Sequence, residues 1–339
     1  MVKISDVARH AGVSPSTVSY VLSGKRSISA ETKERVWEAI ASLGYRPHAG
    51  ARALASSRAN VVALVLPLRS GIHVPVVMQF AISVVTSARE HDHDVLLLTQ
   101  QEGEEGIRRV AASSMVDGVL VMDVQMHDER LPALRSLDRP AVLIGVPEDT
   151  TGLICVDLDF TAAGAACVDH LAELGHRQVA LIGSPPEVYA RETGFAERVE
   201  HGFDDAARRR GMASSVHPCA PSAEAVEELL DTLLLDHPDL TSLVVHNEPL
   251  VEPAIRALQR AGRSVPDQVS VVAICPDEVA ERAPLPVTSV RIPSEELGHR
   301  AVDLLMTLLD GRTVPETTLL TPELTVRAST GPVRPPPRP

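Results

Sequence analysis

Residues 4–20 have the sequence ISDVARHAGVSPSTVSY, which contains two short helical patterns separated by a turn. In the first pattern, Ser5 is a candidate N-cap, and apolar residues recur at helical spacing on one face, at Ile4, Val7, Ala8 and Ala11. Gly12 follows directly, where a tight turn needs a residue that tolerates a positive φ. We therefore expect the first helix to end at Gly12.

The second pattern begins at Ser14, a candidate N-cap, with Pro15 at the first helical position, where its missing N–H costs nothing. Apolar residues then repeat at i, i+3 and i+4, at Val18, Val21 and Leu22. Two short helices joined by a three-residue turn predict a helix-turn-helix. A third helix is expected to start at Ser29 and to stop at Gly44.

The charge of the chain is unevenly distributed. Its 339 residues carry a net charge of −13, which argues against a nucleic-acid partner because phosphate is bound by lysine and arginine. The first 60 residues, however, contain nine basic and four acidic side chains, a net of +5, whereas the rest contain 23 basic and 41 acidic ones, a net of −18. A basic head on an acidic body is typical of a nucleic-acid-binding module joined to another domain, although a short segment can also reach +5 by chance.

Other classes of protein are disfavoured. Charged residues near the N-terminus argue against a signal peptide, and the most apolar long stretch, 74–88, contains polar residues, so no membrane span is expected. The cysteines show no Cys-x-x-Cys spacing, which indicates reduced thiols rather than a disulfide framework or a zinc site: Cys155, Cys167, Cys219 and Cys275. We therefore expect a cytoplasmic protein.

Four blocks in register carry a resemblance to a known family. They are residues 4–14, Ser16-Thr17-Val18-Ser19, Gly44-Tyr45-Arg46-Pro47 and Ala51-Arg52-x-Leu54. Together they resemble the DNA-binding head of the lac-repressor (LacI/GalR-type) transcription regulators. The resemblance implies that the second helix lies in the major groove of operator DNA, with its N-terminal residues at the base edges.

The resemblance also implies roles for single residues. Base-reading positions fall on Pro15, Ser16 and Tyr20, and Thr17, Ser19 and the helix start at Ser14 are expected to contact phosphate. Many relatives have arginine where this chain has Tyr20, so the outer half-site is uncertain, and Tyr20 could instead pack or contact phosphate. Further expected DNA contacts are Ser5, Lys25, His48 and Arg52.

Residues 47–60 match the hinge of the family, which becomes helical on operator DNA. Leu54 matches the leucine that opens the minor groove at the dyad. His48 replaces the usual asparagine and Gly50 adds flexibility, and both weaken the isolated helix. The alternative is that Leu54 only packs within the linker.

From Val61 onward, apolar runs alternate with amphipathic stretches, which predicts an α/β fold with parallel sheets. Strands are expected at 61–66, 94–99, 118–122, 141–145, 178–182, 242–246 and 269–274. Helices are expected at about 76–90, 103–114, 161–174, 200–211, 223–236, 249–261 and 294–310.

The body also resembles the family, through blocks such as Val116-Asp117-Gly118 and Leu174-Gly175-His176-Arg177. This implies a periplasmic-binding-protein-like body of two Rossmann-like lobes with a ligand in the cleft. The expected domains are a head at 1–46, a hinge at 47–60, lobe 1 at about 61–157 and 289–320, lobe 2 at about 158–287, and a disordered tail at 331–339. The chain is expected to cross between the lobes near 157–160, 285–290 and 316–322.

The expected effector-binding residues are His73, Asp157, Arg191, Arg198, Asn247, Glu248 and Cys275. Several depart from sugar-sensing relatives. Residues 72–76 contain no aromatic side chain, Glu248 stands where an aspartate is usual, and Ile274-Cys275 replaces an aromatic-aspartate pair. A sugar is therefore less expected than is usual for the family, and another small molecule or no effector stays open. Asp157 and Arg198 could instead form a salt bridge between the lobes.

The run His91-Asp92-His93-Asp94 resembles a metal site, but its histidines are two residues apart and do not share a helical face, so a solvated turn is favoured. We expect no metal, cofactor or catalytic set.

The sequence thus predicts a homodimeric transcription regulator, a repressor in the simplest case, that binds a pseudo-palindromic operator under control of an unknown small molecule. An effector-independent regulator and a small-molecule binding protein with a vestigial DNA head are the alternatives.

Overall fold

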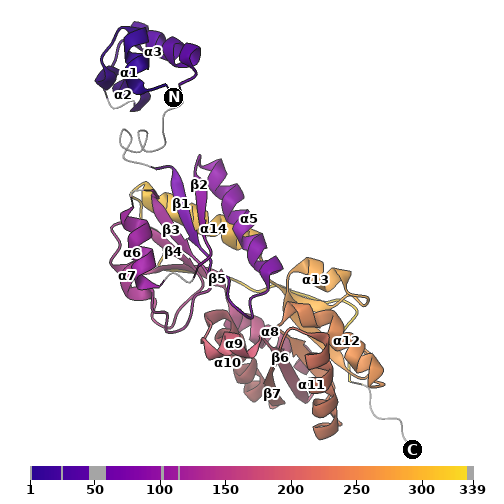
Figure 1. Ribbon diagram of the computed structural model, residues 1–339. Helices are drawn as coiled ribbons and strands as arrows, with labels where there is room; N and C mark the ends of the chain where they lie inside the picture. Colours follow the sequence, from indigo (N-terminus) through magenta and orange to yellow (C-terminus); the bar gives the residue numbers. More distant parts are fainter. Residues whose placement is uncertain (1, 24–25, 46–58, 101–102, 114, 334–339) are drawn as a thin grey trace, which may run out of the picture.

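The computed structural model describes residues 2–23, 26–45, 59–100, 103–113 and 115–333. These residues form a three-helix head and a body of two α/β lobes (Figure 1). Within the described residues, no helix is long and apolar enough to cross a membrane.

The head consists of α1 (Ile4–Ala11), α2 (Pro15–Ser23) and α3 (Ala30–Leu43). They pack around their own apolar core, which includes Val7, Val18, Val36 and Tyr45. Gly12 has a φ of 65°, as the turn requires, and the Arg35 guanidinium donates to the carbonyl oxygen of Ala11 at 2.6 Å. The third helix is capped by Ser29 and ends at Gly44, as predicted.

One cap differs from the prediction. Helix α1 begins at Ile4, so the N-cap position belongs to Lys3 and not to Ser5. The backbone N–H of Lys3 donates to the carboxylate of Asp6 at 2.9 Å. Because Asp6 satisfies this end of the helix, a serine cap at Ser5 is not needed.

Lobe 1 contains a six-stranded parallel sheet in the order β11-β5-β4-β3-β1-β2. The strands are β1 (Val61–Val65), β2 (Asp94–Leu98), β3 (Gly118–Val121), β4 (Ala141–Ile144), β5 (Ile154–Leu158) and β11 (Thr317–Leu320). Along β1, Val62 and Leu64 join the core that contains α5 (Val74–Glu90) and α14 (Ser294–Leu309). Ala63 and Val65 face α6 (Glu104–Ala112) and α7 (Leu131–Arg135) on the other side. This alternation buries both faces of the sheet.

Lobe 2 contains a second sheet in the order β12-β10-β9-β8-β6-β7, which is parallel except for the pairing of β12 with β10. The strands are β6 (Gln178–Gly183), β7 (Ala213–Pro218), β8 (Ser242–Val245), β9 (Ser270–Cys275), β10 (Thr288–Arg291) and β12 (Leu324–Thr325). The helices are α8 (Phe160–Glu173), α9 (Pro186–Ala190), α10 (Gly194–Arg210), α11 (Ala223–Asp236), η1 (Glu248–Leu250), α12 (Val251–Arg260) and α13 (Asp277–Arg282). Gly202 lets α10 approach α8, since a Cβ there would lie 1.9 Å from the carbonyl oxygen of Thr161.

The chain crosses between the lobes after β5, after β10 and after β11. The second crossing comes later than expected, because β10 pairs with β9 and so keeps residues 288–291 in lobe 2. The described C-terminal segment also differs from the expected disorder. His176 lies within hydrogen-bond distance of the carbonyl oxygen of Gly331, and the N–H of Val333 donates to Leu174. Residues 334–339 of the expected tail lie outside the described residues.

Candidate functional site

The N-terminal end of α2 is exposed to solvent at Ser14, Pro15 and Ser16. The Ser14 hydroxyl accepts from the backbone N–H of Thr17 at 3.1 Å, so Ser14 is the predicted cap and Pro15 occupies the first position. Val18 and Val21 point into the head core. Pro15, Ser16 and Tyr20 are exposed, and Thr17 and Ser19 are half-buried. The predicted contact residues therefore share the solvent-facing side of one short helix.

Tyr20 has a cationic neighbour that the sequence analysis missed. The guanidinium carbon of Arg26 lies 5.6 Å from the centroid of the Tyr20 ring, which is within the range of a cation–π contact. Arginine is the residue that most often recognises guanine in the major groove. The available signal was the basic pair Lys25-Arg26 after α2, although spacing alone does not show that Arg26 folds back over Tyr20.

The other predicted DNA contacts cannot be placed in the same way. Ser5 is exposed on α1. Lys25, His48, Arg52 and Leu54 lie outside the described residues, so their roles stay predictions.

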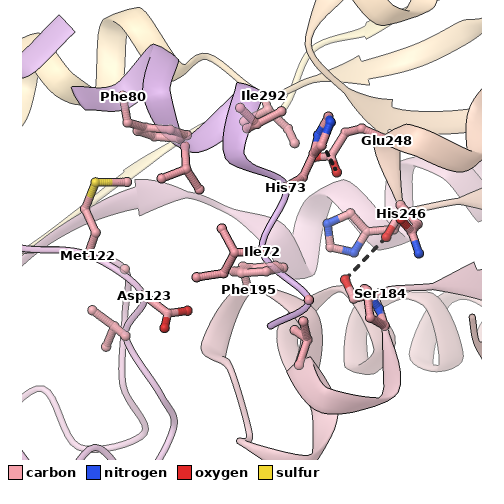
Figure 2. A pocket seen from close by; sticks show the side chains of 18 of the residues that line it. Ile72, His73, Phe80, Met122, Asp123, Ser184, Phe195, His246, Glu248 and Ile292 are labelled. Carbon is pink, nitrogen blue, oxygen red and sulfur yellow. Dashed lines mark hydrogen bonds and ion pairs between the residues drawn. The ribbon is translucent and has the colours of Figure 1, made fainter. Parts of the chain in front are cut away.

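A cavity of about 500 Å³ lies between the two lobes (Figure 2). It is lined by residues at the carboxyl ends of strands from both sheets, among them Leu66 after β1, Met122 and Asp123 after β3, Ser184 after β6, and His246 after β8. Open α/β sheets bind ligands at this edge. The cavity is therefore the candidate effector site.

The cavity contains aromatic side chains that the sequence analysis did not expect. Phe80, Phe160 and Phe195, three of the four phenylalanines in the chain, line it. Phe160 and Phe195 have ring centroids 5.9 Å apart, and His246 completes a triangle with them at 5.9 and 5.7 Å. The lack of an aromatic residue in 72–76 is thus offset by aromatic residues from α5, α8 and α10, and the cavity has apolar surfaces on which a flat ligand can stack.

Five of the seven predicted effector residues line this cavity: His73, Asp157, Arg191, Asn247 and Glu248. Arg198 is not among the lining residues but forms a hydrogen-bonded ion pair with Asp157, from α10 of lobe 2 to β5 of lobe 1. This is the interlobe salt bridge that the sequence analysis left open. Burial raises the pKa of Asp157 to about 6, and Arg198 opposes that shift.

Cys275, the seventh, is fully buried in the lobe 2 core and is not among the lining residues. Burial raises the pKa of its thiol, so it is a small core residue in its neutral form. Asn247 also has a structural role, because its amide nitrogen donates to the carbonyl oxygens of Gly183 and Cys219.

Asp123 is a polar group that the sequence analysis missed. It is the second residue after β3, adopts a φ of 54°, and its Oδ2 lies 3.5 Å from Nη1 of Arg69. Arg191 donates to the carbonyl oxygen of Ser70 across the cleft, while its Nε and Nη2 are buried without a hydrogen-bond partner among the described residues. Because buried polar groups normally find partners, Asp123 and Arg191 offer an acceptor and donors to a ligand.

The opposite end of the cavity is lined by the polar side chains of His73, His246 and Glu248. His73 lies 3.7 Å from Glu248, yet burial lowers the pKa of His73 and raises that of Glu248 to about 7. Burial also lowers the pKa of His246 to about 4, so its ring is neutral. Figure 2 shows this group on one side and Asp123 on the other, with Ile72 and Phe195 between them. Within the described residues, no group of three or more His, Cys, Asp or Glu side chains could hold a metal ion.

Comparisons with known proteins agree with this architecture. The profile of bacterial regulatory proteins of the lacI family matches residues 3–48, and that of the periplasmic binding protein-like domain matches residues 168–330. The HTH-type transcriptional regulator AglR of Rhizobium meliloti is 32% identical, with 98% of this chain and 95% of AglR covered. The regulator CelR of Thermobifida fusca is 31% identical, with 95% and 96% covered.

Solved structures show the same fold. A CelR–cellobiose complex matches with a TM-score of 0.67 and 29% identity, covering 97% of this chain and all of that one. The lac repressor dimer bound to operator and the anti-inducer ONPF matches with a TM-score of 0.81 and 24% identity, covering 97% and 99%. The chain therefore belongs to the LacI family and is a DNA-binding transcriptional regulator.

Proposed function

We propose that this regulator is a repressor that binds a pseudo-palindromic operator as a homodimer, with α2 in the major groove. The observation that carries the proposal is the exposed N-terminal end of α2, where Pro15, Ser16 and Tyr20 face solvent while the other side of the helix is buried. Residues at this end of a recognition helix contact base edges. The Ser14 cap and the first-turn N–H groups suit a phosphate.

A stripe on α5 supports the homodimer. Val74, Met78, Ile82 and Val85 recur at helical spacing on the outer side of lobe 1, and Ile82 is 61% exposed. A row of exposed apolar side chains on one helix is typical of an interface. A second copy is the proposed occupant, because a two-fold protein matches a pseudo-palindromic site.

The proposed effector is a small molecule with an apolar face and several hydroxyl groups. Phe160 and Phe195 offer surfaces for stacking, and Asp123 and Arg191 offer an acceptor and donors at one end. A sugar ring has both features, so the cavity fits a carbohydrate better than residues 72–76 suggest. Cellobiose, which is bound in the CelR complex, is the first probe to test. Because both lobes line the cavity, a ligand there would favour one lobe arrangement over another.

The operator proposal is tested by footprinting the full chain on the DNA upstream of its own gene. We expect a protected two-fold site, with affinity that falls steeply with salt because phosphate contacts release counterions.

The variant Leu54→Gly tests the proposed contact of Leu54 with the minor groove, and we expect it to lose DNA bending and about tenfold or more in affinity. Ser56→Gly is a matched control in the same segment. A Leu54→Gly protein with full affinity and bending would contradict the minor-groove contact, and a wild-type chain without a specific site would contradict the repressor.

A further inference from the structure

The chain that comes from the head reaches the body at Ala59 and Asn60. The buried carboxylate of Asp117 accepts hydrogen bonds from both residues. Asp117 Oδ1 accepts from the backbone N–H of Ala59 at 2.7 Å, and Oδ2 accepts from the N–H of Asn60 at 2.7 Å. Asp117 is 4% exposed. Hydrogen bonds from two backbone amides to one buried carboxylate are strong and fix direction as well as position.

Further hydrogen bonds and contacts surround Asn60 and Asp117. The carbonyl oxygen of Asn60 accepts from the N–H of Asp94 at 2.9 Å, and the N–H of Asp117 donates to the carbonyl oxygen of Val61 at 2.7 Å. Behind the carboxylate, His93 Nε2 lies 3.8 Å from Asp117 Oδ2, and His93 Nδ1 lies 2.7 Å from the carbonyl oxygen of His91. The His91–Asp94 run thus supports this junction from the side of α5 and β2.

The junction is linked to the cavity by two strands. Strand β1 starts next to Asn60 and β3 starts next to Asp117, and the two pair in parallel, with Val62 opposite Gly118 (Figure 1). At their other ends, Leu66 follows β1 and Met122 follows β3, and both line the cavity. A directly paired set of two strands therefore has the Asp117 junction at one end and the candidate effector site at the other.

We propose that Asp117 is a positioning residue for operator binding. Its hydrogen bonds hold residues 59–60, which lead to the head, against β1 and β3. A movement of these strands at the cavity therefore also moves residues 59–60. This inference rests on the proposed function, since it assumes that the head binds an operator.

Two variants remove the junction from opposite sides. Asp117→Asn presents an amide N–H₂ to one of the two backbone N–H groups, and Ala59→Pro removes one donor without altering β3. Asp149→Asn is the matched control, since Asp149 also accepts a backbone N–H, from Thr151 at 3.0 Å, in another part of lobe 1. Hydrogen exchange in the free full-length protein should rise at residues 59–60 in Asp117→Asn and stay at the wild-type rate in the control.

On a labelled operator fragment, we expect Asp117→Asn to lose about tenfold in affinity and most of the DNA bending at an unchanged melting temperature of the head. The double variant should lose little more than either single variant, because both break one contact. The proposal is overturned if exchange at 59–60 is unchanged, if Asp117→Asn binds and bends the operator as well as Asp149→Asn does, or if the two losses add in full. A wild-type chain that binds no DNA would instead refute the proposed function itself.

Discussion

The exposed end of α2 and the cavity between the lobes are built in opposite ways. The first is formed by neighbouring residues, 14–20, whose cap and helix place them on one surface. The second brings together side chains such as Phe80, Asp123 and His246, which are far apart in the sequence and meet only where the strand ends converge. A residue on the surface of α2 can be substituted without affecting its neighbours, whereas each cavity residue also packs against other residues of its lobe.

The two regions also differ in what binds their polar side chains: solvent at the surface of α2, and another side chain of the protein between the lobes. Ser14 and Thr17 are accessible to solvent and can bind water when no partner is present. Asp157 is buried between the lobes, and its carboxylate depends on the half-buried Arg198, whose side chain is 13% exposed. We therefore expect substitutions at the cavity to affect stability and those at the surface of α2 to affect mainly affinity.

The largest effect is expected for Arg198→Ala, which leaves Asp157 buried without its cationic partner. We expect the free energy of unfolding of the body to fall by about 3–4 kcal/mol. Arg208→Ala on the same helix removes a pair with Asp205 whose arginine is 75% exposed, and it should leave the stability of the body almost unchanged. Chemical denaturation followed by circular dichroism measures both variants. Equal losses would show that the pair contributes no more than a surface contact.

A smaller effect, confined to the head, is expected for Val36→Ala. Val36 is fully buried in the head core, so its truncation should cost about 2 kcal/mol, a large share of the stability of so small a unit. Trp37 is the single tryptophan of the chain and lies on α3, so its fluorescence reports the head, while circular dichroism reports mainly the body. Only the fluorescence transition should shift, and Glu38→Ala should shift neither. A parallel shift of both signals would show that head and body unfold together.

The same difference explains what the sequence could and could not predict. The Ser14 cap, the turn at Gly12 and the end of α3 at Gly44 follow from local rules, and the structure has each of them. The seven expected strands of the body are also present. Five more strands lie in the part of the chain that the structure describes, and these were missed. Of these, β7 and β11 are edge strands with polar residues, and β12 has only two residues, so their apolar pattern is weak.

The cavity was predicted only in part, for a physical reason. His246 directly follows β8 and Asp123 is the second residue after β3, so the rule about strand ends could have identified both. Phe80, Phe160 and Phe195 lie on helices at positions that equally suit core packing, and only the arrangement of three helices shows that they meet. Arg26 and Arg35 were missed because their partners, Tyr20 and Ala11, depend on the tertiary fold of the head.

The smallest effect concerns pH and should also separate the two regions. Burial raises the pKa of Glu248 from 4.5 to about 7, so its contribution to stability is complete below about pH 4.5 and is lost as the pH rises through 7. Burial lowers the pKa of His246 from 6.5 to about 4, so its contribution is complete above about pH 6.5 and is lost as the pH falls through 4. The variant Glu248→Gln removes only the first dependence. Relative to the wild type, it should gain about 1–2 kcal/mol in the stability of the body between pH 5 and about pH 6.5. Trp37 fluorescence should show the same pH dependence of the head in both proteins, and a stability difference that does not change with pH would mean that Glu248 titrates normally.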